Sequence, residues 1–208
     1  MRWLTARGGW VCSVPMLLLG GAFAAAIATA QPARDLPSPP RDAGYLERIG
    51  LPDHTVFLPP PPAVGSALGA ADLAVFRATR ALENGSRWQQ AANDDRIGQA
   101  ELLGDFACAL GVDLSAAATP ALSRLLARTG ADLFPIISAA KDHYQRPRPF
   151  VVEQGPVCVT SSPQFAASGA YPSGHAALGW LYALLLAEAD PSNTAAITAR
   201  GRAYGESR

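Results

Sequence analysis

Apolar residues recur with the period of an α-helix through most of this chain, and no run alternates in the way that a half-buried β-strand requires. One such pattern runs from Arg87 to Leu110, which we interpret as a single helix that ends at Gly111. We therefore predict an all-α fold, a single helical-bundle domain. In the first helix, after Ser66, the residues that would share one apolar face are Leu68, Ala71, Val75, Phe76, Thr79 and Leu82.

Residues after position 118 carry further helix signals. Thr119-Pro120 is a typical helix start, and Gly130 is interpreted as the end of that helix. Asp132 would cap the next helix, which reaches Lys141 in its last turn. The apolar run from Ala176 to Glu188 is too short to span a membrane and predicts a helix of the core.

The N-terminal residues resemble an export signal. Arg2 and Arg7 precede an apolar run, Trp10 to Ile27, and small residues follow up to Ala30. This order predicts a secretory signal peptide over residues 1–30, cut after Ala30, with a retained membrane anchor as the alternative. Without these residues the 17 basic side chains fall by two to 15, against 17 acidic ones. Such a balance gives no charged surface for nucleic acid or for an anionic membrane.

Proline marks two segments between the signal peptide and the first long helix. Residues 31–44 include a proline-rich stretch and predict a flexible leader. Pro59 to Pro62 is a run of four prolines, which favours an extended polyproline strap. A linker is the simpler alternative.

One turn, at the start of the predicted core helix, carries the strongest chemical signal. Ser173 and Gly174 lead into His175, so the backbone amides of this turn should point outward without helical partners. Lys141 and Arg148 add two positive charges of the kind that neutralise a phosphoryl group. Each part alone is typical of an ordinary turn or surface residue. Their combination predicts a phosphate site, and no compact carboxylate or histidine cluster indicates a metal.

Three stretches resemble the signature of the type-2 phosphatidic acid phosphatase superfamily: Lys141-x6-Arg148-Pro149, Pro172-Ser173-Gly174-His175 and Ser207-Arg208. From about Tyr45 to Arg208 the chain resembles the bacterial class A non-specific acid phosphatases. The resemblance implies hydrolysis of phosphate monoesters at acid pH without a cofactor. It implies that His175 is the general acid, and that the phosphoryl group is bound by Lys141, Arg148, Ser173, Gly174 and Arg208.

In this family the third motif continues as Ser-Arg-x5-His-x3-Asp, in which the His is the nucleophile and the Asp orients it. Residues 1–208 contain no His followed by Asp at the fourth position. We therefore expect residues 45–208 to be an acid phosphatase domain that lacks the C-terminal His-x3-Asp segment, with at most trace activity. The alternatives are a non-catalytic phosphate-binding relic and a vanadium-dependent haloperoxidase. A further alternative is phosphotransfer to nucleosides by the same site, for which the sequence pattern is the same as for hydrolysis.

The expected partners are small phosphate monoesters and inorganic phosphate, with no membrane contact after signal cleavage. The signal peptide predicts export to the periplasm, and the family resemblance implies a homo-oligomer. Two cysteines, Cys108 and Cys158, remain after cleavage. In an exported protein these two can form a disulfide, and the other interpretation is a pair of buried thiols.

Overall fold

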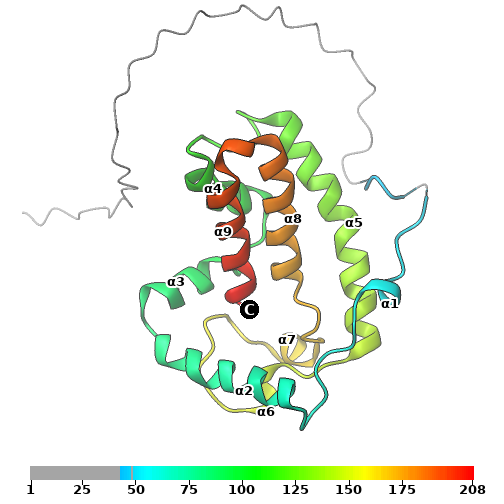
Figure 1. Cartoon of the computed structure of the whole chain (residues 1–208), viewed down its shortest axis with the longest axis vertical. Coiled ribbons are helices and arrows are strands. Elements are labelled where there is room, and N and C mark those ends of the chain that lie inside the picture. Colours follow the sequence, from blue (N-terminus) through cyan, green and yellow to red (C-terminus); the bar gives the residue numbers. More distant parts are fainter. Residues whose placement is uncertain (1–42, 48) are drawn as a thin grey trace, which may run out of the picture. The chain divides into compact units, whose positions relative to one another are not determined.

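Residues 43–47 and 49–208 are described by a computed structural model of the chain (Figure 1). The predicted signal peptide and all but the last two residues of the predicted leader lie outside the described residues. No described residue lies in a β-strand, which confirms the all-α prediction. The elements, in chain order, are α1 (His54–Phe57), α2 (Ala67–Thr79), the 3-10 helix η1 (Arg80–Leu82), α3 (Ser86–Asn93), α4 (Gln99–Leu110), α5 (Pro120–Tyr144), α6 (Pro149–Val152), α7 (Pro163–Ala167), α8 (Gly174–Ala189), the 3-10 helix η2 (Pro191–Asn193) and α9 (Thr194–Glu206).

The α8 and α9 helices run antiparallel and side by side, and they form the centre of the core (Figure 1). Glycine permits their close approach: a Cβ atom on Gly179 would lie 2.4 Å from Cβ of Tyr204, and one on Gly201 would lie 2.4 Å from Cβ of Ala183. Helices α4 and α5 pack against this pair. The buried core is made of Leu102, Leu103, Phe106, Leu110, Leu114, Leu126, Leu178, Tyr182, Ala183, Leu186, Ile197 and Tyr204.

Helix α5 is continuous, so the prediction that Gly130 ends a helix was wrong. Gly130 is buried within α5, where a Cβ atom would lie 3.7 Å from the Leu178 side chain of α8. Gly130 therefore lies in the interface between α5 and α8, although glycine costs roughly 1 kcal/mol relative to alanine inside a helix. Asp132 caps no helix either. Its carboxylate accepts the backbone N–H groups of Tyr45 at 2.8 Å and Leu46 at 3.2 Å, which ties the segment before α1 to α5.

The single helix predicted from Arg87 to Leu110 is divided in two. Helix α3 ends at Asn93, a turn follows, and α4 begins after Gly98. The turn contains Asp94, whose side chain is fully buried because groups on and just after α9 bind its carboxylate. A charge that must be satisfied by another helix thus interrupts the helical pattern at this point.

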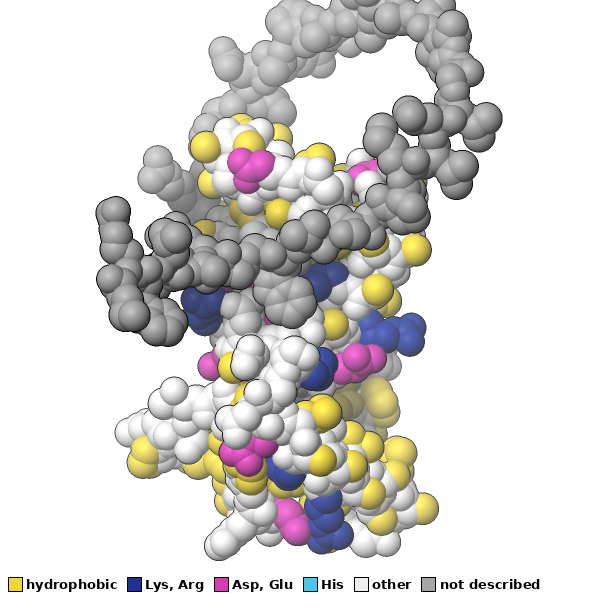
Figure 2. Space-filling model, turned by 90° about the vertical axis from the view of Figure 1, so that its left-hand side faces the viewer, with side chains coloured by type: hydrophobic (Ala, Val, Ile, Leu, Met, Phe, Trp, Pro, Cys, Tyr) yellow, Lys and Arg dark blue, Asp and Glu magenta, His cyan; other side chains and the backbone are white. Residues whose placement is uncertain are grey.

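The apolar face predicted for α2 is not buried. No residue of α2 is buried, and Leu68, Val75 and, in η1, Leu82 are exposed. Figure 2 shows hydrophobic side chains on the lower part of one face, at the end of the molecule where α2 lies. An ion pair between Arg77 and Glu153, with a shortest N···O distance of 2.8 Å, joins α2 to the residue after α6. The helix itself was thus predicted correctly, but a helical period does not indicate whether another element covers the apolar face.

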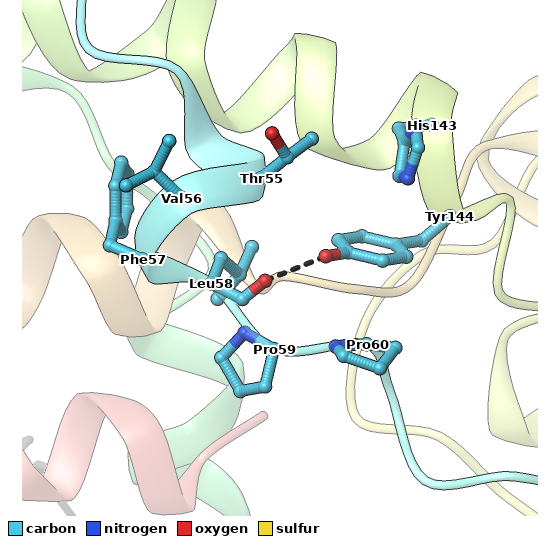
Figure 3. A pocket seen from close by; sticks show the side chains of 8 residues that line it. All are labelled: Thr55, Val56, Phe57, Leu58, Pro59, Pro60, His143 and Tyr144. Carbon is cyan, nitrogen blue, oxygen red and sulfur yellow. Dashed lines mark hydrogen bonds between the residues drawn. The ribbon is translucent and has the colours of Figure 1, made fainter.

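The polyproline strap crosses the end of α5. The Tyr144 hydroxyl donates to the carbonyl oxygen of Leu58 at 2.7 Å, and the Tyr171 hydroxyl donates to that of Pro59 at 2.8 Å. The strap, α1 and the last turn of α5 line a pocket of about 500 Å³ (Figure 3). Because Tyr171 begins the turn before α8, these two bonds hold the strap beside the predicted site.

No disulfide joins Cys108 and Cys158, so that interpretation is corrected for the part of the chain that the structure describes. Cys108 lies on the exposed side of α4, whereas Cys158 is half-buried in the loop between α6 and α7. The Sγ atom of Cys158 lies 3.9 Å from the guanidinium of Arg208. Among the described helices, none has the combination of length and hydropathy needed to cross a membrane.

Alkaline pH tests the burial of Tyr182. Burial raises the pKa of Tyr182 to about 12, whereas an unfolded tyrosine titrates near 10. The stability that this tyrosine contributes is therefore complete below about pH 10 and is lost as the pH rises towards about 12. Over this range, we expect the free energy of unfolding of Tyr182→Phe to fall by about 2 kcal/mol less than that of the unsubstituted protein.

Urea unfolding at a series of alkaline pH values measures this difference. Tyr45→Phe is the matched control, since Tyr45 is exposed. Equal losses in Tyr182→Phe and the unsubstituted protein would contradict the burial of this hydroxyl.

Candidate active site

The N-terminus of α8 is built as an anion site requires. Ser173 is the N-cap residue, and its Oγ accepts the backbone N–H of Ala176 at 3.3 Å. The first amides of a helix have no intrahelical acceptor, so those of Gly174 and His175 remain available to a ligand. The closest contact of a Cβ atom on Gly174 would be Ile137 at 3.7 Å. A Cβ atom would therefore fit at this position without a clash. Because glycine has no side chain, the backbone amides here remain open to an approaching ligand.

Lys141 lies in the last turn of α5 and faces the segment that leads into this turn. Its ammonium donates to the carbonyl oxygen of Gly169. A Cβ atom on Gly169 would lie 3.0 Å from the Lys141 carbonyl oxygen, so the two backbones are in close contact. Burial lowers the pKa of Lys141, and the positive charge of Arg148 lowers it further. A negative charge between Lys141 and Arg148, such as a phosphate, would relieve this repulsion.

The Arg148 guanidinium is held in a fixed orientation. Its Nε donates to the carbonyl oxygen of Phe165 at 2.7 Å, and its Nη2 donates to Oγ of Ser168 at 2.8 Å. Its Cζ atom lies 3.6 Å from the centre of the Phe165 ring. The Nη1 group takes no part in these bonds. Burial lowers the pKa of Arg148, Asp95 opposes this, and Arg208 adds to it. Arginine nevertheless keeps its charge, so this group is a preoriented cation.

His175 and Arg208 meet at the turn between α3 and α4. The Nε2 of His175 lies 3.0 Å from the carbonyl oxygen of Asp95, which can only accept, so this nitrogen carries a proton. Arg208 donates to the carbonyl oxygen of Ala91 at 2.8 Å and lies 3.4 Å from the Asp95 carboxylate. Burial lowers the pKa of His175. The bond to Asp95 opposes that shift, and the charges of Arg208 and Arg148 strengthen it.

A buried polar network holds the residues that follow α9 in place. The Asp94 carboxylate is fully buried and accepts from Nη2 of Arg200 at 2.6 Å and from Oγ of Ser207 at 2.7 Å. Burial opposes ionisation of Arg200, but the hydrogen bonds and charge of Asp94 raise the pKa of Arg200 overall. Arg87 also donates to Ser207 Oγ, at 2.9 Å. Because Arg208 is the next residue, this network fixes where its side chain emerges.

Sequence reasoning did not identify Asp94 or Asp95. The available signal was two adjacent carboxylates inside a stretch interpreted as one apolar-faced helix, where a buried carboxylate needs a partner. The predicted site residues, in contrast, lie at one end of the bundle, near the C-terminal ends of α5 and α9 and the N-terminal end of α8 (Figure 1). Among residues that the structure describes, no three His, Cys, Asp or Glu side chains gather as they would around a metal ion.

Several known proteins are similar in sequence to this chain. A family model that describes the PAP2 superfamily matches residues 117–199. An acid phosphatase of Zymomonas mobilis is 40% identical over 157 residues, which cover 75% of this chain and 60% of that protein. A non-specific acid phosphatase of Providencia stuartii is 35% identical over 192 residues, which cover 90% of this chain and 77% of that protein. A non-specific acid phosphatase of Salmonella typhimurium is 32% identical over 157 residues, or 73% of this chain and 62% of that protein.

The family model matches the α5–α9 region, and the three relatives match 73% to 90% of the chain. The chain belongs to the PAP2 superfamily and, within it, to the bacterial class A non-specific acid phosphatases. It spans 60% to 77% of the length of the three relatives above.

Removing the Asp94 carboxylate tests the network behind Arg208. In Asp94→Ala, we expect the free energy of unfolding to fall by about 2 kcal/mol or more, because Arg200 and Ser207 lose their shared buried acceptor and Arg200 keeps only Asp105, at 3.3 Å, as an ion-pair partner among the described residues. Asp72→Ala is the matched control: it breaks an ion pair to Arg146 in which Asp72 is 47% exposed, so the expected loss is below about 1 kcal/mol. Urea denaturation at neutral pH measures both, and equal losses would contradict the structural role of Asp94.

Proposed function

We propose that this protein is an exported, metal-independent acid phosphatase, whose site binds the phosphoryl group of small phosphate monoesters. The observation that carries the proposal is the grouping of Lys141, Arg148, His175 and Arg208 around the N-terminus of α8. Contacts within this group support it: His175 and Arg208 both lie 3.4 Å from Oδ1 of Asp95. Lys141 and Arg148 both donate to carbonyl oxygens of the short segment 165–169. Membership of a family whose compared members carry the name acid phosphatase supports it as well.

The proposed chemistry follows from the charge of the substrate. A phosphate monoester is an anion, and its transition state spreads charge over three non-bridging oxygens. Lys141, Arg148 and Arg208 would neutralise that charge, and Ser173 with the amide of Gly174 would orient it. Three side-chain cations and a helix N-terminus can do this without a metal.

His175 would be the general acid. Its protonated imidazole would give its proton to the oxygen of the departing alcohol as the P–O bond breaks, typically a contribution of roughly 10²- to 10⁴-fold. The lowered pKa of His175 makes the imidazole largely neutral at neutral pH, so the acid form is favoured in acid solution. Bound phosphate would raise that pKa again by cancelling the charges of Arg148 and Arg208.

In the family the phosphoryl group passes to the His of the third motif, which residues 1–208 do not contain. We infer that these residues by themselves bind and polarise phosphate, and that they turn it over only by direct attack of water. Export to the periplasm and a homo-oligomeric state remain part of the same proposal, on the basis of the predicted signal peptide and the family.

Loss of the Lys141 charge should weaken binding of inorganic phosphate. In Lys141→Met, which keeps the length of the side chain, we expect the Kd for phosphate to rise about tenfold or more, because one hydrogen bond between charged partners is lost. Arg124→Met is the matched control, since Arg124 is exposed on the same helix. Isothermal titration calorimetry in mildly acidic buffer measures both, and an unchanged Kd in Lys141→Met would count against the site.

Turnover is tested separately from binding. We expect the purified 208-residue chain to bind phosphate and yet hydrolyse p-nitrophenyl phosphate only in trace amounts at mildly acidic pH, since the family nucleophile is not among its residues. The Providencia stuartii relative is the positive control. A comparable rate in the two proteins would show that another group supplies the nucleophile.

A further inference from the structure

Asp95 stands between two groups of the proposed phosphate site. Its Oδ1 lies 3.4 Å from Nε2 of His175 and 3.4 Å from Nη2 of Arg208. Its backbone carbonyl accepts a separate bond from the same imidazole nitrogen at 3.0 Å. The Asp95 side chain is 37% exposed, so the carboxylate lies at the mouth of the site and not in the core.

The adjacent Asp94 has different surroundings from Asp95. The Asp94 carboxylate is fully buried and is bound by Arg200 and Ser207, which secures α9. The Asp95 carboxylate is directed instead to His175 and Arg208, and it also acts electrostatically on Arg148. The Asp94 carboxylate therefore stabilises the core, whereas the Asp95 carboxylate contacts residues of the proposed site.

The cations around Asp95 are the ones that a phosphate would require. A carboxylate and a phosphoryl group seek the same donors, namely guanidinium and imidazolium N–H groups. Two anions that share those donors repel each other, and the binding of one is weakened by the presence of the other.

We propose that the Asp95 carboxylate is a built-in counter-anion of the phosphate site, which pairs with His175 and Arg208 in the empty protein and must be displaced from them when phosphate binds. The inference rests on the proposed function, because it assumes that phosphate occupies this site. The competition weakens phosphate binding, and it also favours release of inorganic phosphate as the carboxylate returns to its partners. Asp95 is thus a positioning residue for His175 and Arg208.

The same contact controls the titration of His175. The charged groups that face this imidazole are Asp95 from the turn after α3, Arg148 from the residue before α6 and Arg208 from the segment after α9. Substitution by asparagine removes the negative charge but keeps the backbone carbonyl that accepts from Nε2. The imidazole then faces two arginines without a compensating carboxylate, so its pKa should fall.

The test compares Asp95→Asn with Asp113→Asn in the 208-residue chain. Asp113 is exposed in the loop after α4, so its substitution makes the same change of charge away from the site. Calorimetry measures the Kd for inorganic phosphate, and NMR measures the titration of His175 in phosphate-free buffer. The sequence has only three histidines, so a His175→Gln spectrum assigns the resonance.

We expect Asp95→Asn to bind phosphate about tenfold more tightly than the unsubstituted protein, with a lower pKa for His175, and Asp113→Asn to change neither. Weaker or unchanged phosphate binding in Asp95→Asn overturns the displacement. An unchanged His175 titration overturns the pairing with the imidazole. If circular dichroism shows that Asp95→Asn is misfolded, Asp95→Ser takes its place.

Failure of the proposed function gives a different result. If neither the unsubstituted protein nor the variants bind phosphate, the phosphate site itself is wrong and displacement by phosphate fails with it. The NMR titration needs no phosphate, so it still decides whether Asp95 pairs with His175.

Discussion

The ion pair between Asp94 and Arg200 is the interaction on which the rest of the structure depends. It joins the turn between α3 and α4 to α9 through a carboxylate that has no exposure to solvent. A buried charge without a partner costs several kcal/mol, so this pair fixes the register of α9 against the bundle. The placement of Ser207 and Arg208 follows directly, because Ser207 donates to the same carboxylate.

Close packing of α8 on α9 is the second requirement. Gly179 and Gly201 lie where a Cβ atom would overlap the neighbouring helix, so the two axes approach more closely than larger residues permit. This contact brings the N-terminal end of α8 to the same end of the bundle as the C-terminal end of α9 (Figure 1). The helix N-terminus, with its unpaired amides, thus lies beside an arginine from the last described residue.

Features that depend on neighbouring residues in the chain could be predicted from the sequence. The turn before α8 and the location of Lys141 in the last turn of a helix follow from local signals, and both are present. Features that depend on distant partners could not. Gly130 lies inside α5, where Leu178 of another helix packs beside it. Asp94 interrupts the predicted helix because its buried carboxylate pairs with Arg200, which is more than a hundred residues away in the chain. The apolar face of α2 was predicted from its period, but whether a distant element buries that face could not be predicted from the sequence.

The central claim is that Lys141, Arg148 and the first amides of α8 surround one tetrahedral oxyanion. A crystal structure of the protein grown with inorganic phosphate or tungstate tests it most directly. The account predicts one anion whose oxygens lie within hydrogen-bond distance of the Lys141 ammonium, the Arg148 guanidinium and the Gly174 amide, with His175 beside it. An anion bound elsewhere, with these groups unliganded at the same concentration, would contradict it.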